Sequence, residues 1–120
     1  MKEIRITRSD KLVERLAALH VRLEGEAIVS DSMPTKRGNK TYNNLLLTDI
    51  RFIFNNKMYI IEHCWLQEVD YMFTSNLDVR DLNSKIKISF DFYKYRDKID
   101  TGQHGMNIYG SKVIKKIKNK

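Results

Sequence analysis

The chain has 120 residues, of which 42% are hydrophobic and 31% charged, and its formal net charge is +7. This length predicts one domain (residues 1–120), and the balance of apolar and charged residues excludes a disordered chain. No apolar run reaches the roughly 18 residues that a membrane span needs, and the charged start does not resemble a signal peptide. We therefore expect a soluble cytoplasmic protein. Cys64 is the one cysteine, so neither an internal disulfide nor a cysteine-rich zinc site is expected.

The positive charge is concentrated in two regions. Residues 31–60 carry five basic and two acidic groups, and residues 101–120 carry five basic groups and no acidic one. A basic excess of this kind attracts polyanions, because phosphate contacts release bound counterions. Lysines that merely keep a small protein soluble would give the same total, so the charge alone leaves both interpretations open.

The first thirty residues predict one helix and one strand. Over residues 8–18, Leu12, Val13 and Leu16 are spaced for one helical face, and Ser9 or Asp10 can cap the start. From residue 21 to 29 apolar and polar residues alternate, which predicts a strand. Gly25 interrupts this strand, as a glycine does at a bulge or sharp bend.

The rest of the chain predicts a mobile loop, four more strands and a short helix. The loop covers residues 31–42 and contains the only proline and a glycine. Strands are expected over residues 45–54, 58–66, 85–96 and 106–117, and apolar residues at helical spacing predict a helix over 68–79. In strand 45–54 we expect Leu46, Ile50, Phe52 and Phe54 on one face. The last residues, 112–120, form a basic end that serves either as an extra contact to a nucleic-acid backbone or as a solvated tail.

Five strands with a helix between the third and fourth predict an all-β fold, an OB-like Greek-key barrel with an additional N-terminal helix. An SH3-like barrel and an α+β sheet are the alternatives, and the helix at 68–79 favours the OB fold. In an OB barrel the ligand lies across the second and third strands, flanked by the loops between strands 1 and 2 and between strands 4 and 5.

These two loops are rich in cations and tyrosines, the residues that hold phosphates and stack on bases. The residues expected to bind nucleic acid are Lys36, Arg37, Lys40 and Tyr42 from the first loop, Tyr93, Lys94, Tyr95, Arg96 and Lys98 from the second, and Arg51 and Trp65 from the strands. On the third strand we expect Tyr59, Ile61, His63 and Trp65 to share one face, which is then a stacking platform. The alternative is that Trp65 belongs to the core.

No catalytic or metal constellation is evident, so we expect neither an enzyme nor a cofactor. His63 and Cys64 are adjacent on a strand and point to opposite faces, so they cannot chelate one metal together. Asp49 and Glu62 are the carboxylates that a magnesium-dependent nuclease would use, but the alternation puts them on opposite faces. The sequence also lacks a glycine-rich phosphate loop and a Ser-His-Asp set.

Several strand segments resemble a known family. They are Lys40-Thr41-Tyr42, Leu45 to Arg51, Glu62 to Leu66, Lys85 to Phe90 and Tyr93-Lys94-Tyr95. This pattern resembles small proteins of phages and plasmids of low-GC Gram-positive bacteria, above all the OB-fold single-stranded DNA-binding proteins of lactococcal phages. The resemblance covers about residues 25–117. It implies protection of single-stranded DNA during replication or recombination, by a dimer or higher homo-oligomer. This chain ends in lysines instead of the acidic tail of bacterial relatives, which argues against recruiting enzymes through that tail.

The leading hypothesis is therefore sequence-tolerant binding of single-stranded DNA, with RNA as a further ligand. A second hypothesis is a protein-binding module, or an inhibitor of a host nucleic-acid enzyme or defence system. A magnesium-dependent nuclease using Asp49 and Glu62 is the third.

Overall fold

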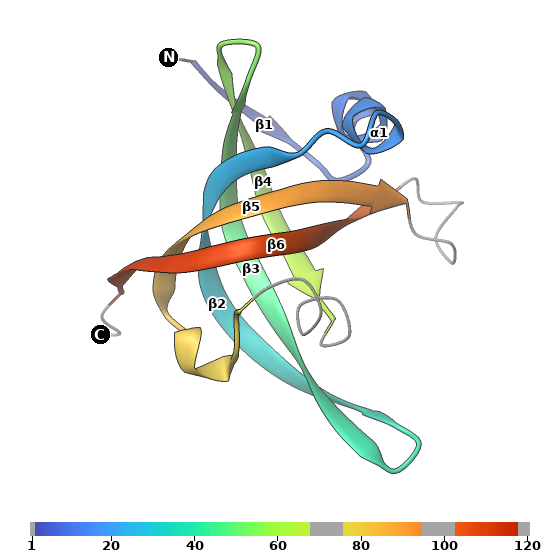
Figure 1. Ribbon diagram of the computed structural model, residues 1–120, viewed down its shortest axis with the longest axis vertical. Coiled ribbons are helices and arrows are strands. Elements are labelled where there is room, and N and C mark those ends of the chain that lie inside the picture. Colours follow the sequence, from blue (N-terminus) through green and yellow to red (C-terminus); the bar gives the residue numbers. More distant parts are fainter. Residues whose placement is uncertain (1, 68–75, 95–102, 118–120) are drawn as a thin grey trace.

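The computed structural model describes residues 2–67, 76–94 and 103–117, with the exception of the Arg37 side chain (Figure 1). Its elements are β1 (Glu3–Ile6), α1 (Lys11–Ala18), β2 (Leu23–Arg37), β3 (Lys40–Phe54), β4 (Lys57–Leu66), the single 3-10 turn η1 (Val79–Asp81), β5 (Ser84–Lys94) and β6 (His104–Lys116). The protein is thus built mostly of β-strands, as the sequence predicts. Within the described ranges, no helix is long and apolar enough to cross a membrane.

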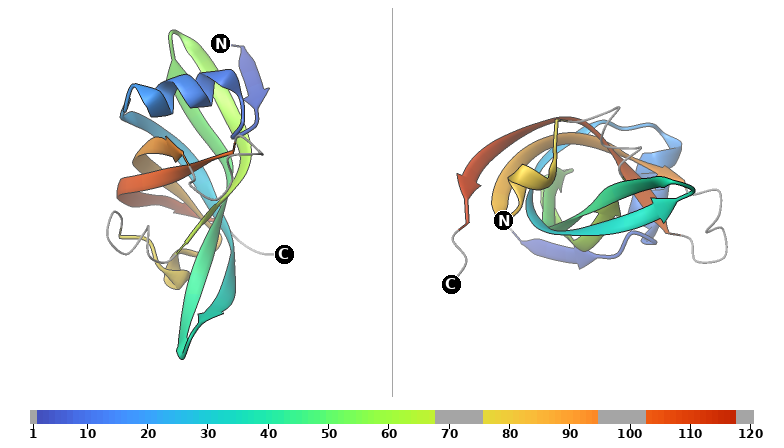
Figure 2. Two further views of the ribbon diagram at one scale, coloured as in Figure 1. Left: turned by 90° about the vertical axis from the view of Figure 1, so that its right-hand side faces the viewer. Right: turned by 90° about the horizontal axis from the view of Figure 1, so that it is seen from below.

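All six strands belong to one sheet in the order β1-β4-β3-β2-β5-β6. β1 runs parallel to β4, and the other neighbours are antiparallel. The sheet is strongly curled, so that its two outermost strands approach one another (Figure 2). Arg8, which follows β1, is linked to His104, the first residue of β6. The backbone N–H of His104 donates to the Arg8 carbonyl at 3.1 Å, and the Arg8 guanidinium donates to the His104 carbonyl at 3.2 Å.

The core fills the inner side of this curled sheet. Phe52, Phe90 and Phe92 are buried and meet edge to face, with ring centroids 5.6–5.9 Å apart. Helix α1 packs against the same core through Val13 and Leu16, both fully buried. Its start is capped as expected, because the Asp10 carboxylate accepts the N–H of Leu12 at 2.9 Å.

A β-bulge in β3 changes which residues face the core. Between Glu26 and Ile28 of β2 the pairing with β3 shifts by one residue, and Asp49 of β3 has a φ of +46°. An extra residue reverses the alternation of a strand. Leu45 and Leu47 are therefore buried before the bulge, and Ile50 and Phe52 after it. The expectation that Leu46 shares a face with Ile50 and Phe52 is wrong for this reason.

Other predicted elements change at their boundaries. Residues 31–37 and 40–42 are not a loop, because they extend β2 and β3 into a long hairpin. The predicted helix over 68–79 lies mostly outside the described residues, and of its described part only Val79 is helical, in the turn η1. The last strand begins at His104, two residues earlier than predicted. The short strand β1 was not predicted, although Ile4 and Ile6 alternate with charged residues there.

Gly25 marks a close approach between two strands, not simply a bend. A Cβ atom at this position would lie 2.1 Å from the Arg51 carbonyl oxygen of β3. Because any side chain would collide with the main chain of β3, only glycine allows β2 and β3 to pair this closely.

Candidate nucleic-acid interface

The hairpin of β2 and β3 extends beyond the core as a two-stranded arm, visible at the lower end of Figure 1. In this arm residues 31–37 pair with residues 40–46. The strands are joined through Gly38 and Asn39, and Gly38 adopts a φ of +64° that a tight turn needs and glycine tolerates. The arm carries Lys36 and Lys40, both exposed, close to its tip.

One face of the arm combines a cation, an aromatic ring, a methionine and two polar side chains. Lys40, Tyr42 and Asn44 alternate onto this face, and pairing brings Met33 and Thr35 of β2 beside them. The Asn44 side-chain amide donates to the Thr35 hydroxyl at 3.0 Å, which ties the two strands together. Tyr42 is half-buried, and Met33 is 52% exposed. Lys36 lies on the opposite face of the arm.

This face continues onto the outer side of β3 and β4. Leu46 pairs with Trp65, and Thr48 pairs with His63. Trp65 and Leu46 are half-buried and His63 is exposed, so Trp65 is neither a core residue nor fully exposed. At about 3.3 Å per residue, Tyr42 and Leu46 are roughly 13 Å apart along β3. We call this surface the outer platform, formed by Met33, Tyr42, Leu46, His63 and Trp65.

The predicted platform on β4 is partly wrong, because Tyr59 faces the core. Its ring stacks on Phe52 with centroids 5.6 Å apart. Glu62 and His63 are both exposed, so the alternation of β4 changes at the same level as the bulge in β3. Tyr59 and Ile61 are therefore inside, whereas His63 and Trp65 are outside.

Arg51 lies on the other side of the bulge from the outer platform. Its Nη1 atom is 2.7 Å from Oε1 of Glu3 in β1, and both side chains are partly exposed. This ion pair ties β1 to the sheet and neutralises the guanidinium. Arg37 ends β2 at the tip of the arm.

The second predicted group lies elsewhere. Tyr93 and Lys94 end β5 beside α1, in the upper half of Figure 1, whereas the arm points the other way. A Cβ atom at Gly105 would lie 2.4 Å from Cζ of Tyr93, so the tyrosine ring covers this glycine. Tyr95, Arg96 and Lys98 lie outside the described residues. The structure thus brings Lys40, Tyr42 and Trp65 onto one surface but does not bring Lys94 to them.

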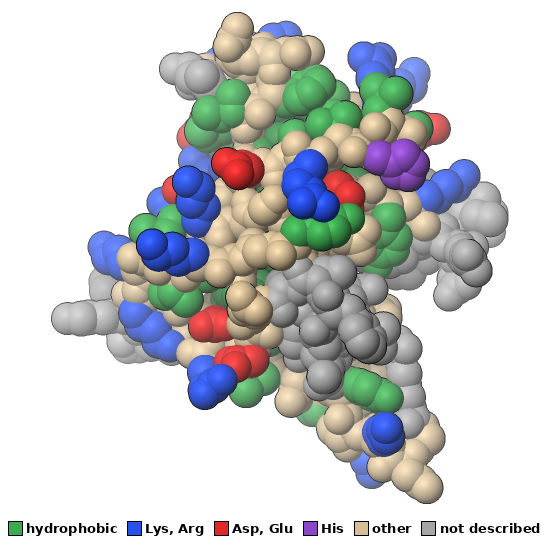
Figure 3. Space-filling model, in the orientation of Figure 1, with side chains coloured by type: hydrophobic (Ala, Val, Ile, Leu, Met, Phe, Trp, Pro, Cys, Tyr) green, Lys and Arg blue, Asp and Glu red, His purple; other side chains and the backbone are tan. Residues whose placement is uncertain are grey.

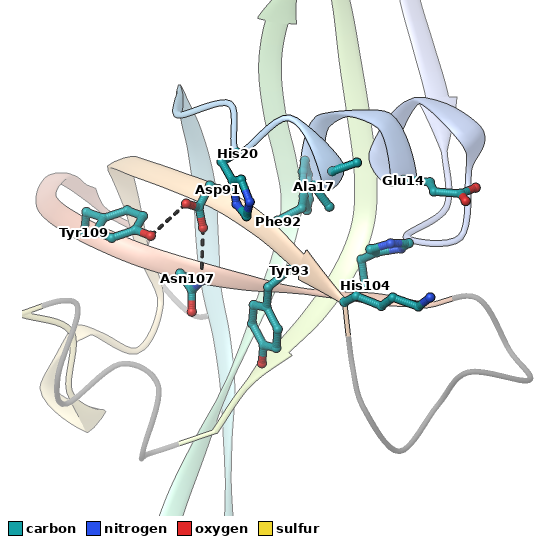
Figure 4. Close-up of a pocket in the computed structure, with 11 residues that line it drawn as sticks. Glu14, Ala17, His20, Asp91, Phe92, Tyr93, His104, Asn107 and Tyr109 are labelled. Carbon is teal, nitrogen blue, oxygen red and sulfur yellow. Dashed lines mark hydrogen bonds between the residues drawn. The ribbon is translucent and has the colours of Figure 1, made fainter.

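A hollow of about 420 Å³ between α1, β5 and β6, with polar and apolar lining residues, was not predicted (Figure 4). At one side of the hollow the Asp91 carboxylate accepts from the Asn107 amide at 3.0 Å and from the Tyr109 hydroxyl at 2.7 Å (Figure 4). The hydrogen bond to Asp91 raises the pKa of Tyr109. The Arg22 guanidinium lies 3.7 Å from the centre of the Tyr109 ring. Both oxygens of the Asp91 carboxylate thus accept hydrogen bonds from residues of β6. This network joins β5 to β6. The sequence does not predict this contact, because Asp91 and Asn107 are 16 positions apart and meet only through the pairing of β5 with β6.

Among the described residues, no group of three histidine, cysteine or carboxylate side chains is placed to hold a metal ion. Cys64 is buried and His63 exposed, in agreement with their expected opposite directions. No protein-family model, curated protein or solved structure matches the chain. Function is therefore inferred from the surface itself.

Proposed function

We propose that the protein binds single-stranded nucleic acid, DNA in the first place, across the outer platform and without sequence preference. The observation that carries this proposal is the shared surface of Tyr42 and Trp65, with Lys40 beside Tyr42. Aromatic faces stack on any base, and a cation holds the neighbouring phosphate. Protection of DNA in phage replication or recombination, and a homodimer, belong to the same proposal.

The strand order supports an OB-like barrel as the scaffold. Strands β2, β3, β4 and β5 lie in the spatial order β5-β2-β3-β4, which is the 4-1-2-3 order of a Greek key, and β6 follows β5. If β1 is an addition to this barrel, β3 and β4 correspond to its second and third strands. OB folds bind their ligands across these two strands, where the outer platform lies here.

A fluorescence titration tests the proposal, because Trp65 is the only tryptophan. We expect oligo(dT) to change its emission and to bind more tightly than duplex DNA, with RNA as a third ligand. Replacing Tyr42 by alanine should weaken binding about 5- to 150-fold, since stacking contributes roughly 1–3 kcal/mol per base.

Charge removal is tested separately. The double variant Lys36→Gln/Lys40→Gln should reduce the slope of log affinity against log salt by about 0.7, the contribution of one phosphate contact, because Lys40 lies on the face of the outer platform and Lys36 on the opposite face of the arm. Its matched control is Lys2→Gln/Lys57→Gln, which removes two exposed lysines from the other end of the sheet. Equal affinity for single-stranded and duplex DNA, or equal slopes for the two double variants, would contradict the proposal.

A further inference from the structure

The outer side of β5 and β6 carries lysines directly opposite one another. Lys87 of β5 pairs with Lys112 of β6, and Lys85 pairs with Lys115. We call these four residues the lysine face. Figure 3 shows Lys and Arg side chains gathered at the left, over the start of β5 and the end of β6. Like charges directly opposite each other destabilise a sheet. On its other side Lys87 lies opposite Glu26 of β2, whereas Lys112 and Lys115 of the outermost strand β6 have only lysines opposite them.

Only one of the four lysines has a carboxylate partner in the described part of the chain. Lys85 Nζ is 3.3 Å from Glu26 Oε1. Lys87, Lys112 and Lys115 form no such ion pair with a described residue. Glu24 lines the same shallow hollow of about 220 Å³ as Lys87 and Lys112, but it pairs with neither.

Protection of a sheet edge explains only part of the lysine face. β6 is an outermost strand, and lysines on such a strand hinder edge-to-edge aggregation. This reason applies to Lys112 and Lys115. It does not apply to Lys87, because β5 lies between β2 and β6 and has no free edge along this stretch.

The lysine face is connected to the outer platform by a row of paired residues across the sheet. His63 pairs with Thr48, Thr48 with Ile28, Ile28 with Lys85, and Lys85 with Lys115. Four steps between neighbouring strands, at about 4.8 Å each, make this row roughly 19 Å long. The outer surface is therefore continuous from the aromatic residues of β4 to the lysines of β6.

We infer that the lysine face binds the phosphate backbone of the same single strand that stacks on the outer platform. This inference rests on the proposed function. Lysine ammonium groups bind phosphates as point charges, and no aromatic residue lines the hollow between Lys87 and Lys112. The bases of this part of the strand face solvent. The negative phosphates offset the repulsion between the opposed lysines, so a nucleic-acid backbone is a ligand of matching charge for the lysine face.

The test compares a short and a long oligo(dT), of about 4 and about 12 nucleotides, within the range that one OB fold covers. Lys87→Gln/Lys112→Gln should bind the long strand about 25-fold more weakly at 0.1 M salt. Each phosphate contact contributes about 0.7 to the slope of log affinity against log salt. Two lost contacts therefore lower the affinity by a factor of about 10 to the power 1.4 at 0.1 M salt, taking 1 M salt as the reference. Affinity for the short strand should not change. Lys2→Gln/Lys57→Gln is again the matched control and should leave both affinities close to those of the natural protein.

A stability measurement gives a second readout. Lys112→Glu creates an opposite-charge pair with Lys87, so Tm should rise by about 2–4 °C at low salt while affinity for the long strand falls. An unchanged salt slope for the long strand in Lys87→Gln/Lys112→Gln, or an equal loss in the control, would overturn the inference. If Tyr42→Ala binds normally and the lysine variants do not, the platform proposal fails, and the lysine face is a phosphate site that binds the strand without stacking.

Discussion

Replacing Gly25 by alanine places a methyl group against the main chain of β3. The new Cβ atom would lie 2.1 Å from the Arg51 carbonyl oxygen and 3.1 Å from its carbonyl carbon. Carbon and oxygen atoms in contact are normally about 3.3–3.6 Å apart, so β2 and β3 must separate by more than about 1 Å. Separation on this scale stretches the neighbouring hydrogen bonds beyond about 3.5 Å. Overpacking and weakened pairing together should cost about 3 kcal/mol.

Thermal unfolding followed by circular dichroism measures this loss. For a domain of this size about 3 kcal/mol corresponds to a fall in Tm of roughly 12 °C. Gly110→Ala is the matched control, because no atom lies within 4 Å of the Cβ that it would add and the backbone there does not need a positive φ. A Gly25→Ala protein that melts within a degree or two of the Gly110→Ala protein would refute the close approach of β2 and β3.

Three further predictions concern single side chains. Tyr109 should ionise above its usual pKa of 10.0, and Asp91→Asn should lower this pKa, as followed by tyrosinate absorbance with Tyr109→Phe as the reference. Because the folded pKa is raised, the stabilisation by this hydrogen bond is complete below pH 10 and is lost as the pH rises through the folded value. Asp10→Ala removes the cap of α1 and should lower the unfolding free energy by about 1 kcal/mol in urea titrations, whereas Asp10→Asn should retain most of it. Cys64 is fully buried, so a thiol reagent should modify it at the rate of unfolding, and fast labelling of the folded protein would contradict its position in the core.

Local periodicity predicts the core strands of this protein well. In β5 buried residues alternate with more exposed ones without interruption from Ile86 to Phe92. The strand predicted over residues 85–96 agrees with β5 in its described part. The N-terminal helix is present as α1, but it begins at Lys11 instead of residue 8, with Asp10 as its cap. These elements are predictable because each has one face in the core, and burial imposes a period of two or 3.6 residues.

The arm was predicted to be a loop because it has no such constraint. Residues 31–37 and 40–44 stand beyond the core, so their apolar and polar residues need not alternate, and Pro34 within a strand favours a loop prediction. The bulge at Asp49 is also invisible in the sequence, since one extra residue in a strand leaves its composition unchanged. The composition of the outer platform follows from this bulge. The sequence predicts that Trp65 and Tyr59 share one face of β4, but the alternation of β4 changes at the level of the bulge, so Tyr59 faces the core and Trp65 the outer side.

The contact between Arg8 and His104 joins residues that are 96 positions apart. Closing so long a segment has a large entropic cost before any hydrogen bond forms, so contacts of this kind are expected late in folding. The N-terminal segment and β6 must already be in place when they meet. During synthesis, His104 emerges from the ribosome long after the hairpin of β2 and β3 is complete. The curled sheet is therefore fastened only after β6, the last of the six described strands, has been made, and a nascent chain that stops before β6 keeps an unpaired edge on β5.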